Sequence, residues 1–255
     1  EWAAGLPDLS DDQCFLNFTS SHDGIGVRPL TGLLSTEEIE ELVGEVEKRG
    51  GRVSRKANSD GTESPYELNI TYASALSEAG DESLGNARFL CSQIVALSLK
   101  GIPAVYLPCL FGAANYEEGL ALTGRNRTIN REKWERNALE SSLAPGGEFA
   151  EIFSEYQLIL QRRRSYPAFH PNASQRIHSL GTEFFVVERR SPNQTILCIS
   201  NFSAKKQVFK RLDAIGGVAG IEKFYEIIGG RTLRPRKRGL SLGPYQTVWL
   251  VAKPE

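Results

Sequence analysis

The sequence of 255 residues contains no methionine, only four cysteines and no long uninterrupted apolar run. Scattered as they are, the cysteines argue against a disulfide framework and against a zinc site. The longest apolar-rich stretch, 94–107, is broken by Lys100, Gly101 and Pro103, so we expect no transmembrane helix and no membrane partner. From so few, scattered thiols we expect a reduced, cytoplasmic location.

An excess of charge of either sign is also missing. The chain has 30 basic and 31 acidic residues, for a net charge of -1. Proteins that bind nucleic acid through a broad basic field need a positive excess, so we expect no nucleic-acid partner. With 40% hydrophobic and 24% charged residues, the composition is that of an ordinary globular protein. Because the chain starts at Glu1 and lacks methionine, we expect a piece of a longer polypeptide.

Helical periodicity dominates the first two thirds of the chain. Ser35 and Glu38 form a capping-box pattern before an apolar stripe, and this predicts a helix over 36–49. Similar stripes predict helices over 84–100 and 148–164. The polar stretch 52–65 predicts a long surface loop, and the apolar run 104–107 predicts a short buried strand. This order of helices around a buried strand is typical of a parallel α/β sheet or barrel.

After about residue 175 the pattern changes to short β-rich runs separated by turn residues. Strands are predicted over 184–187, 195–200, 207–212 and 247–251. We therefore expect two domains. One covers residues 1–170 and includes an inserted subdomain at about 24–72, and the other is a small antiparallel β domain over 171–255.

The strongest chemical signal is an apolar run, starting at Cys14, that leads directly into His22-Asp23-Gly24. In α/β barrels, polar residues at the carboxyl end of a strand point into the active site. A carboxylate beside an imidazole can bind neighbouring sugar hydroxyls, because Asp accepts and His donates. The alternative is a simple turn that Asp23 caps, and spacing alone favours neither interpretation.

Two further polar segments follow. The run Gly124–Arg131 carries three arginines in seven residues and suits the recognition of carboxylate, phosphate or hydroxyl groups. Taken alone, it is better explained as a solvated helix start. Tyr66 and Glu67 come directly after the polar stretch 52–65, and their simpler interpretation is a loop anchor.

Taken in order, these segments resemble the α-amylase superfamily (glycoside hydrolase family 13) and, within it, the sucrose-phosphorylase-like subfamily. The resemblance is carried by FLNFTSSHDGIGVRPLTGLL, SPYELNITYASAL, GIPAVYLPCLFG, GRNRTINRE and RRSYPAFHPNA. It implies an α/β fold: the C-terminal part of a (β/α)8 TIM barrel, with its last two strands and helices and an excursion after strand seven, followed by a small antiparallel β domain. It also implies that the nucleophilic Asp and the acid/base Glu of the family lie upstream of Glu1. We therefore expect the C-terminal half of the enzyme, inactive alone.

The activity implied by the resemblance is retaining phosphorolysis of an α-glucoside to α-glucose 1-phosphate. The resemblance implies that the enzyme acts on an α-glucoside with inorganic phosphate as co-substrate, and that it needs no cofactor and no metal. The catalytic residues present are Asp23, which binds the glucosyl 2- and 3-hydroxyls, and His22, which orients it. The implied substrate-binding residues are Arg127, Tyr66 and Glu67. By resemblance, Arg127 holds the glucosyl 3-/4-hydroxyl edge, and Tyr66 and Glu67 lie on the phosphate and acceptor side.

The resemblance leaves several points open. Glu67 stands where sucrose phosphorylase has Gln, and Ser64 where it has Asp, which implies an acceptor other than plain fructose, such as glycerate, glycerol or a sugar phosphate. The alternatives are a retaining α-glucosidase or transglucosylase, and a non-catalytic carbohydrate-binding remnant. Because two barrel strands leave an open parallel edge, we expect the chain to pair with its missing N-terminal half or with a second copy of itself.

Overall fold

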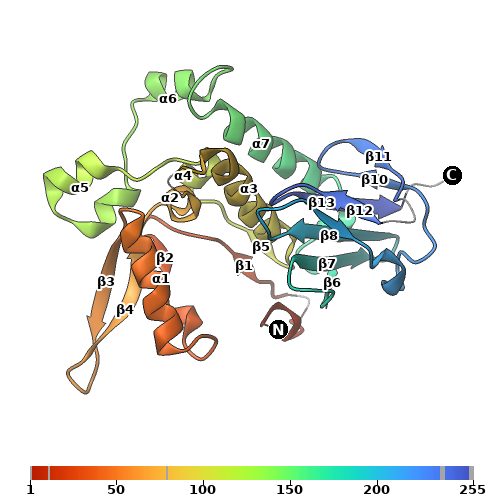
Figure 1. The fold of residues 1–255 in the computed structure, drawn as a ribbon, viewed down its shortest axis with the longest axis horizontal. Coiled ribbons are helices and arrows are strands. Elements are labelled where there is room, and N and C mark those ends of the chain that lie inside the picture. Colours follow the sequence, from red (N-terminus) through yellow and green to blue (C-terminus); the bar gives the residue numbers. More distant parts are fainter. Residues whose placement is uncertain (1, 11, 79, 236–238, 253–255) are drawn as a thin grey trace. The chain divides into compact units, whose positions relative to one another are not determined.

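The computed structural model describes residues 2–10, 12–78, 80–235 and 239–252. The chain divides into two compact units, each assembled from segments that are distant in sequence (Figure 1). The first unit comprises Glu1–Asn17, Leu90–Ala104 and Gln157–Glu255, and the second comprises Phe18–Phe89 and Val105–Tyr156. The predicted domain boundary near residue 170 stays a prediction.

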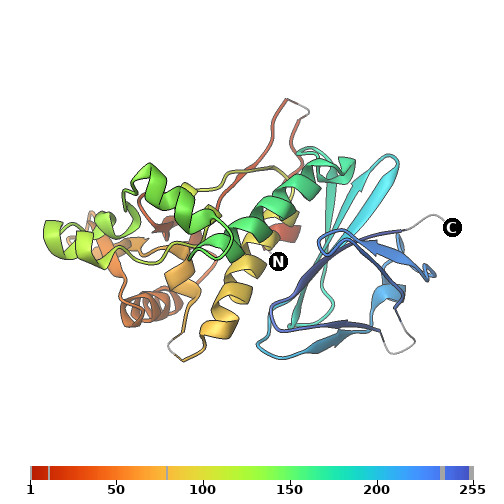
Figure 2. The same cartoon turned by 90° about the horizontal axis from the view of Figure 1, so that it is seen from above.

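The first unit is built on a six-stranded antiparallel sheet in the order β11-β10-β13-β8-β7-β6, with a separate β12-β9 pair. The sheet strands are β6 (Ser174–His178), β7 (Phe184–Ser191), β8 (Gln194–Asn201), β10 (Phe224–Glu226), β11 (Arg231–Leu233) and β13 (Thr247–Ala252). The pair consists of β9 (Gln207–Phe209) and β12 (Leu240–Leu242). The strands of this unit curve toward one another in Figure 2, and their buried side chains form a hydrophobic core. The predicted antiparallel C-terminal sheet is confirmed, with β6, β10, β11 and β12 in addition to the expected strands.

The central strands β8 and β13 are buried on both faces. Leu197, Val248 and Leu250 belong to the hydrophobic core. Cys198 and Trp249 lie at the alternating positions, on the other face of the sheet, and are also buried. The Trp249 indole donates to Ser98 Oγ at 2.8 Å. Burial on both faces explains why these strands appear in the sequence as nearly continuous apolar runs.

The same unit contains a short parallel strand pair. In it β1 (Leu16–Asn17) pairs with β5 (Ile102–Pro103). The strand predicted over 104–107 is wrong in its position. The strand β5 ends at Pro103, and α4 (Leu107–Leu110) begins at the last residue of the predicted range. Pro108 in the first turn of α4 explains the difference, since its fixed φ favours a helix start and it has no N–H to donate to a sheet.

Three long helices match the sequence patterns closely. They are α1 (Thr36–Lys48), α3 (Glu82–Ser98) and α7 (Ala150–Arg164). In α1 the predicted capping box is present: Ser35 Oγ accepts from the Glu38 N–H, and the Glu38 carboxylate accepts from the Ser35 N–H at 2.7 Å. Amphipathic periodicity and capping are local signals, so sequence alone locates these helices well.

The second unit contains a three-stranded antiparallel sheet in the order β2-β4-β3, on which α1 packs. Its strands are β2 (Ile25–Gly26), β3 (Arg52–Ala57) and β4 (Glu63–Asn69). The predicted surface loop over 52–65 is therefore wrong, because the segment forms the β3–β4 hairpin. Most of β3 is exposed or half-buried on both faces, so it shows no alternation of apolar and polar residues from which a strand could be predicted.

The remaining elements are short. The helices are α2 (Tyr72–Leu76), α5 (Glu117–Thr123) and α6 (Arg136–Leu143), and the 3-10 turns are η1 (Trp2–Ala4), η2 (Arg28–Leu30), η3 (Asn126–Asn130), η4 (Pro167–Phe169) and η5 (Leu212–Ala214). Within the described ranges, no helix combines the length and apolarity needed to span a lipid bilayer. Of these elements, η3 follows α5 and carries Arg127, one of the residues predicted to bind substrate.

Candidate active site

The His22-Asp23-Gly24 segment of the second unit forms a tight turn against the β2-β4-β3 sheet. Ser21 and Gly24 exchange two main-chain hydrogen bonds, each of 3.0 Å. Gly24 has a φ of 118°, and a β-carbon there would lie 2.2 Å from the Leu68 carbonyl oxygen. Only glycine fits at this position, because the turn is pressed against the backbone of β4.

The guanidinium of Arg127 joins this turn to β4. Arg127 donates twice to the Glu67 carboxylate, from Nε to Oε2 at 3.0 Å and from Nη2 to Oε1 at 2.8 Å. Its Nε also lies 3.4 Å from Asp23 Oδ1. The hydrogen bonds to Glu67 raise the pKa of Arg127 above its ordinary value. The structure thus brings Asp23, Glu67 and Arg127 together in one cluster.

Arg131 is a member of this cluster that sequence reasoning missed. Its Nη2 lies 2.5 Å from Asp23 Oδ1, and its Nε donates to the His22 carbonyl oxygen at 3.0 Å. His22 Nε2 is 3.4 Å from the same Asp23 oxygen. The signal was present in the sequence, since Arg131 ends the arginine-rich run 124–131, but the resemblance was applied to Arg127 alone.

Glu67 is placed to act through Arg127 and not by direct contact with a substrate. Its side chain is only 8% exposed, whereas those of Arg127 and Asp23 are 44% and 27% exposed. Both carboxylate oxygens of Glu67 accept hydrogen bonds from Arg127. A bidentate pair of this kind fixes the orientation of a guanidinium as well as its position.

Tyr66 owes its orientation to an irregularity in the hairpin. The pairing of β3 with β4 passes from Ser54↔Glu67 to Arg55↔Pro65, so Tyr66 is the extra residue of a β-bulge. Bulges change the direction of a side chain and occur often beside active sites. Tyr66 is 38% exposed.

The two arginines of β3 bind to neighbouring groups outside the Asp23 cluster. Arg55 forms a two-pronged ion pair with Glu40 of α1, at 2.9 and 2.8 Å, and Arg52 donates to the carbonyl oxygens of Gly50 and Gly51. Arg55 thus joins the hairpin to α1, and Arg52 binds the two glycines that follow α1.

Near the turn in sequence or in contact with Asn130 are further polar groups that are buried or half-buried. Tyr106 donates to the Asn130 carbonyl oxygen at 2.6 Å, and Ser20 Oγ lies 3.1 Å from Cys109 Sγ. Burial raises the pKa of the Cys109 thiol and that of the Tyr106 phenol above their ordinary values. A thiol with a raised pKa stays protonated near neutral pH, so Cys109 does not have the properties of a nucleophile.

The cluster is suited to binding hydroxyl or anionic groups. It presents the Asp23 carboxylate as an acceptor and the Arg127 and Arg131 guanidinium groups as donors. Among the residues that the structure describes, no group of three or more His, Cys, Asp or Glu side chains is arranged to hold a metal ion. The Asp23, Arg127 and Arg131 side chains can recognise polar groups and stabilise charge.

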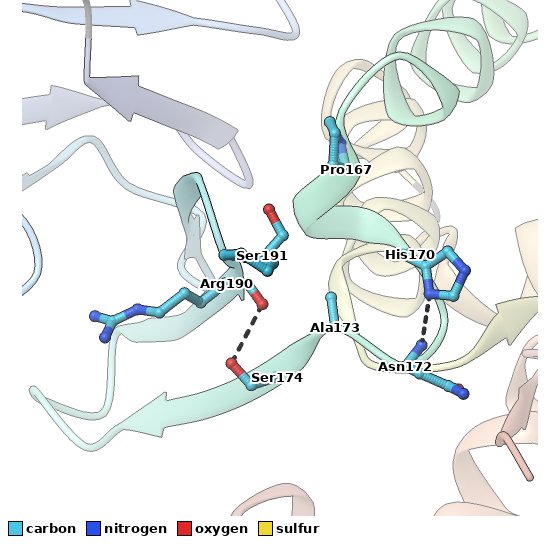
Figure 3. A pocket seen from close by; sticks show the side chains of 8 residues that line it. Pro167, His170, Asn172, Ala173, Ser174, Arg190 and Ser191 are labelled. Carbon is cyan, nitrogen blue, oxygen red and sulfur yellow. Dashed lines mark hydrogen bonds between the residues drawn. The ribbon is translucent and has the colours of Figure 1, made fainter. Parts of the chain in front are cut away.

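A hollow on the first unit carries no comparable cluster. It encloses about 640 Å³ and is lined by residues of η4, β6 and the β7–β8 turn. Figure 3 shows that the Arg190 guanidinium points away from His170, while Ser174 Oγ donates to the Arg190 carbonyl oxygen. The Arg190 side chain is paired with Glu188, so this hollow is a weaker candidate for a catalytic site.

Comparison with known proteins identifies the family, although no family model matches the chain. The chain is 38% identical over 260 residues to a glucosylglycerate phosphorylase of Spirochaeta thermophila, and the alignment covers 98% of this chain and 44% of that protein. It is 39% identical over 254 residues to a glucosylglycerate phosphorylase of Allomeiothermus silvanus, with 98% and 42% covered. A sucrose phosphorylase of Agrobacterium vitis is 30% identical over 161 residues, with 59% and 30% covered.

The chain belongs to the sucrose-phosphorylase-like branch of the α-amylase superfamily. It spans less than half the length of these curated relatives and matches their C-terminal part. The resemblance inferred from the sequence motifs is therefore confirmed.

Solved structures support the fold of this branch. The crystal structure of sucrose 6F-phosphate phosphorylase from Thermoanaerobacter thermosaccharolyticum gives a TM-score of 0.61 at 24% identity, over 73% of this chain and 36% of that one. An AmyP variant in complex with maltotriose gives 0.54 at 11% identity, over 71% and 37%. These similarities confirm the predicted fold class, the C-terminal portion of a TIM-barrel enzyme with an antiparallel β domain.

Proposed function

We propose that this chain is the C-terminal part of a retaining phosphorylase, which cleaves an α-glucoside with inorganic phosphate and releases α-glucose 1-phosphate. One observation carries the proposal: Asp23, Arg127 and Arg131 form a partly exposed cluster in a chain similar to glucosylglycerate phosphorylases over 98% of its length. Retaining displacement requires a nucleophilic carboxylate and a second carboxyl group as acid and base. In this proposal both belong to the part of the relatives that this chain does not span.

Asp23 binds the glucosyl hydroxyls in this reaction. Its contacts with His22, Arg127 and Arg131 all involve Oδ1, which leaves Oδ2 to accept from a sugar hydroxyl. As the glycosidic bond breaks, positive charge develops at the anomeric carbon. A fixed carboxylate stabilises that charge more strongly than it stabilises the neutral substrate, and the interaction therefore lowers the barrier.

Arg127 is assigned to the 3-/4-hydroxyl edge of the glucosyl group, and Tyr66 to the phosphate and acceptor side. Glu67 holds Arg127 through Nε and Nη2, so Nη1 is the nitrogen available to a carboxylate or hydroxyl oxygen. We assign glycerate as the acceptor, because three relatives are glucosylglycerate phosphorylases. Tyr66, turned by the bulge, flanks the same acceptor.

The proposal extends to the conditions of the reaction. Phosphate is a co-substrate, and the reaction uses no resident metal or organic cofactor, so activity is expected to survive dialysis against EDTA. The two-stranded β1-β5 sheet leaves Leu16 and Ile102 61% and 44% exposed, which supports association with an N-terminal barrel portion. Four free thiols support a reducing, cytoplasmic location.

The test is a product analysis on the full-length protein that contains this chain. Glucosylglycerate, glucosylglycerol, sucrose and sucrose 6F-phosphate are each incubated with and without phosphate, and glucose 1-phosphate and glucose are quantified. We expect phosphate-dependent glucose 1-phosphate, most rapidly from glucosylglycerate, and no turnover by the 255-residue chain alone. Glucose release at an equal rate without phosphate would indicate a hydrolase instead. Turnover by the isolated chain would refute the proposal that the nucleophile and the acid/base lie outside it.

A further inference from the structure

The main chain of Asp23 is held by side chains on both of its polar atoms. The Asp23 N–H donates to Ser21 Oγ at 3.2 Å. The Asp23 carbonyl oxygen accepts from Asn69 Nδ2 at 2.8 Å and from Asn130 Nδ2 at the longer distance of 3.4 Å. Neither asparagine was a candidate from sequence. Both are buried, at 0% and 3% exposed, so both amides are isolated from solvent.

The orientation of the Asn69 amide follows from its two neighbours. A carbonyl oxygen only accepts, so the amide nitrogen must face Asp23. The amide oxygen then faces Ser54, whose hydroxyl donates to Asn69 Oδ1 at 2.7 Å. Because Asn69 ends β4 and Ser54 lies on β3, this relay connects the β3–β4 hairpin to the turn that carries Asp23.

The second amide comes from a different element. Asn130 ends η3, and its own carbonyl oxygen accepts from the Tyr106 hydroxyl at 2.6 Å. The sheet and η3 therefore both hold the Asp23 carbonyl oxygen. On the other side, contact of Gly24 with the Leu68 carbonyl prevents the turn from moving toward β4.

We propose that Asn69, with Asn130 as the weaker partner, is a positioning residue that sets the direction of the Asp23 carboxylate through its main-chain carbonyl. Asn69 touches no substrate and acts only through Asp23. The inference rests on the proposed function for its effect on rate, but the contacts themselves are independent of that function. A displacement of a catalytic group by about 1 Å costs on the order of 100-fold in rate, and loss of the 2.8 Å bond frees the turn for such a displacement.

The test uses Asn69→Ala in the full-length protein, with Asn58→Ala as the matched control. Asn58 lies near the tip of the same hairpin, where its amide donates to Thr62 Oγ1 on the exposed surface. We expect kcat/KM for phosphorolysis to fall about 100-fold in Asn69→Ala and to stay within about twofold in Asn58→Ala. Circular dichroism and thermal unfolding establish that both variants are folded.

A double-mutant cycle with Asp23→Asn separates positioning from a general structural effect. If Asn69 acts through Asp23, then Asn69→Ala costs only about two- to threefold more in the Asp23→Asn background. If the full 100-fold loss is added to that of Asp23→Asn, the positioning role is wrong.

Hydrogen exchange provides a readout that does not depend on activity. The Gly24 N–H donates to Ser21 within the turn, so its protection reports how well the turn is held. We expect faster exchange of the segment 20–24 in Asn69→Ala and unchanged exchange in Asn58→Ala. Unchanged exchange in both variants overturns the positioning proposal. A protein that shows this exchange effect but produces no glucose 1-phosphate overturns the proposed function alone.

Discussion

Replacing Gly24 by alanine tests whether the tight His22–Asp23 turn is needed for activity. A β-carbon at Gly24 would lie 2.2 Å from the Leu68 carbonyl oxygen and 3.2 Å from Asn69 Cα. Ordinary contacts between carbon and oxygen begin at about 3.3 Å, so the turn must move by about 1 Å away from β4. Since Asp23 precedes Gly24 directly, its carboxylate moves too, and we expect kcat/KM to fall about 100-fold.

Stability provides the internal control for this prediction. A non-glycine residue at the φ of 118° costs on the order of 1–3 kcal/mol of the free energy of unfolding. Gly32 has a φ of 84°, and no atom lies within 4 Å of the position that a β-carbon would take there. Gly32→Ala therefore carries a comparable backbone cost without any displacement of Asp23.

The assay compares both variants in the full-length protein by initial rates of glucose 1-phosphate formation and by urea unfolding. We expect similar losses of stability in the two variants and a large loss of kcat/KM in Gly24→Ala only. If Gly24→Ala keeps its kcat/KM within twofold of the parent, the turn does not have to be fixed for catalysis. Equal losses of activity in the two variants would attribute the effect to stability and would also refute the reasoning.

Three further predictions follow from the same contacts. Asp23→Asn in the full-length protein is expected to lower kcat/KM for phosphorolysis by at least about 100-fold with an unchanged circular dichroism spectrum, and an unchanged kcat/KM contradicts its role. Glu67→Gln leaves Arg127 only one acceptor oxygen, so KM for the α-glucoside is expected to rise about tenfold with kcat within threefold. A fall in kcat at constant KM would instead place Glu67 in the chemical step. Burial raises the pKa of Cys91 to about 11 and of Cys198 to about 12. Because the unfolded thiols ionise near pH 9, the unfolded chain loses these protons first, and the free energy of unfolding is expected to fall as pH rises from about 9 toward 11. Urea unfolding at pH 8 and pH 10 measures this, and a Cys91→Ala, Cys198→Ala variant should show the weaker dependence.

Local patterns were enough to predict the long helices and the central strands. The capping box at Ser35 and the apolar stripe of α1 act within one helix, and the structure confirms both. The runs that became β8 and β13 are buried on both faces, so their apolar character is continuous. The β3–β4 hairpin was missed because β3 is exposed or half-buried along its length and its pairing depends on partners on a different strand.

The sequence by itself determined the family, through motifs whose order and spacing match the sucrose-phosphorylase-like branch, and it determined which residue types carry the chemistry. It named His22, Asp23, Tyr66, Glu67 and Arg127, whose catalytic and binding roles stay predictions. Only the tertiary structure decided which atoms meet: Arg131 beside the Asp23 carboxylate, Glu67 behind Arg127, and the buried Asn69 amide on the Asp23 carbonyl oxygen. The physical reason is that hydrogen bonds between residues 46 to 108 positions apart depend on how the hairpin and η3 fold onto the turn, and no local pattern of residues records that arrangement.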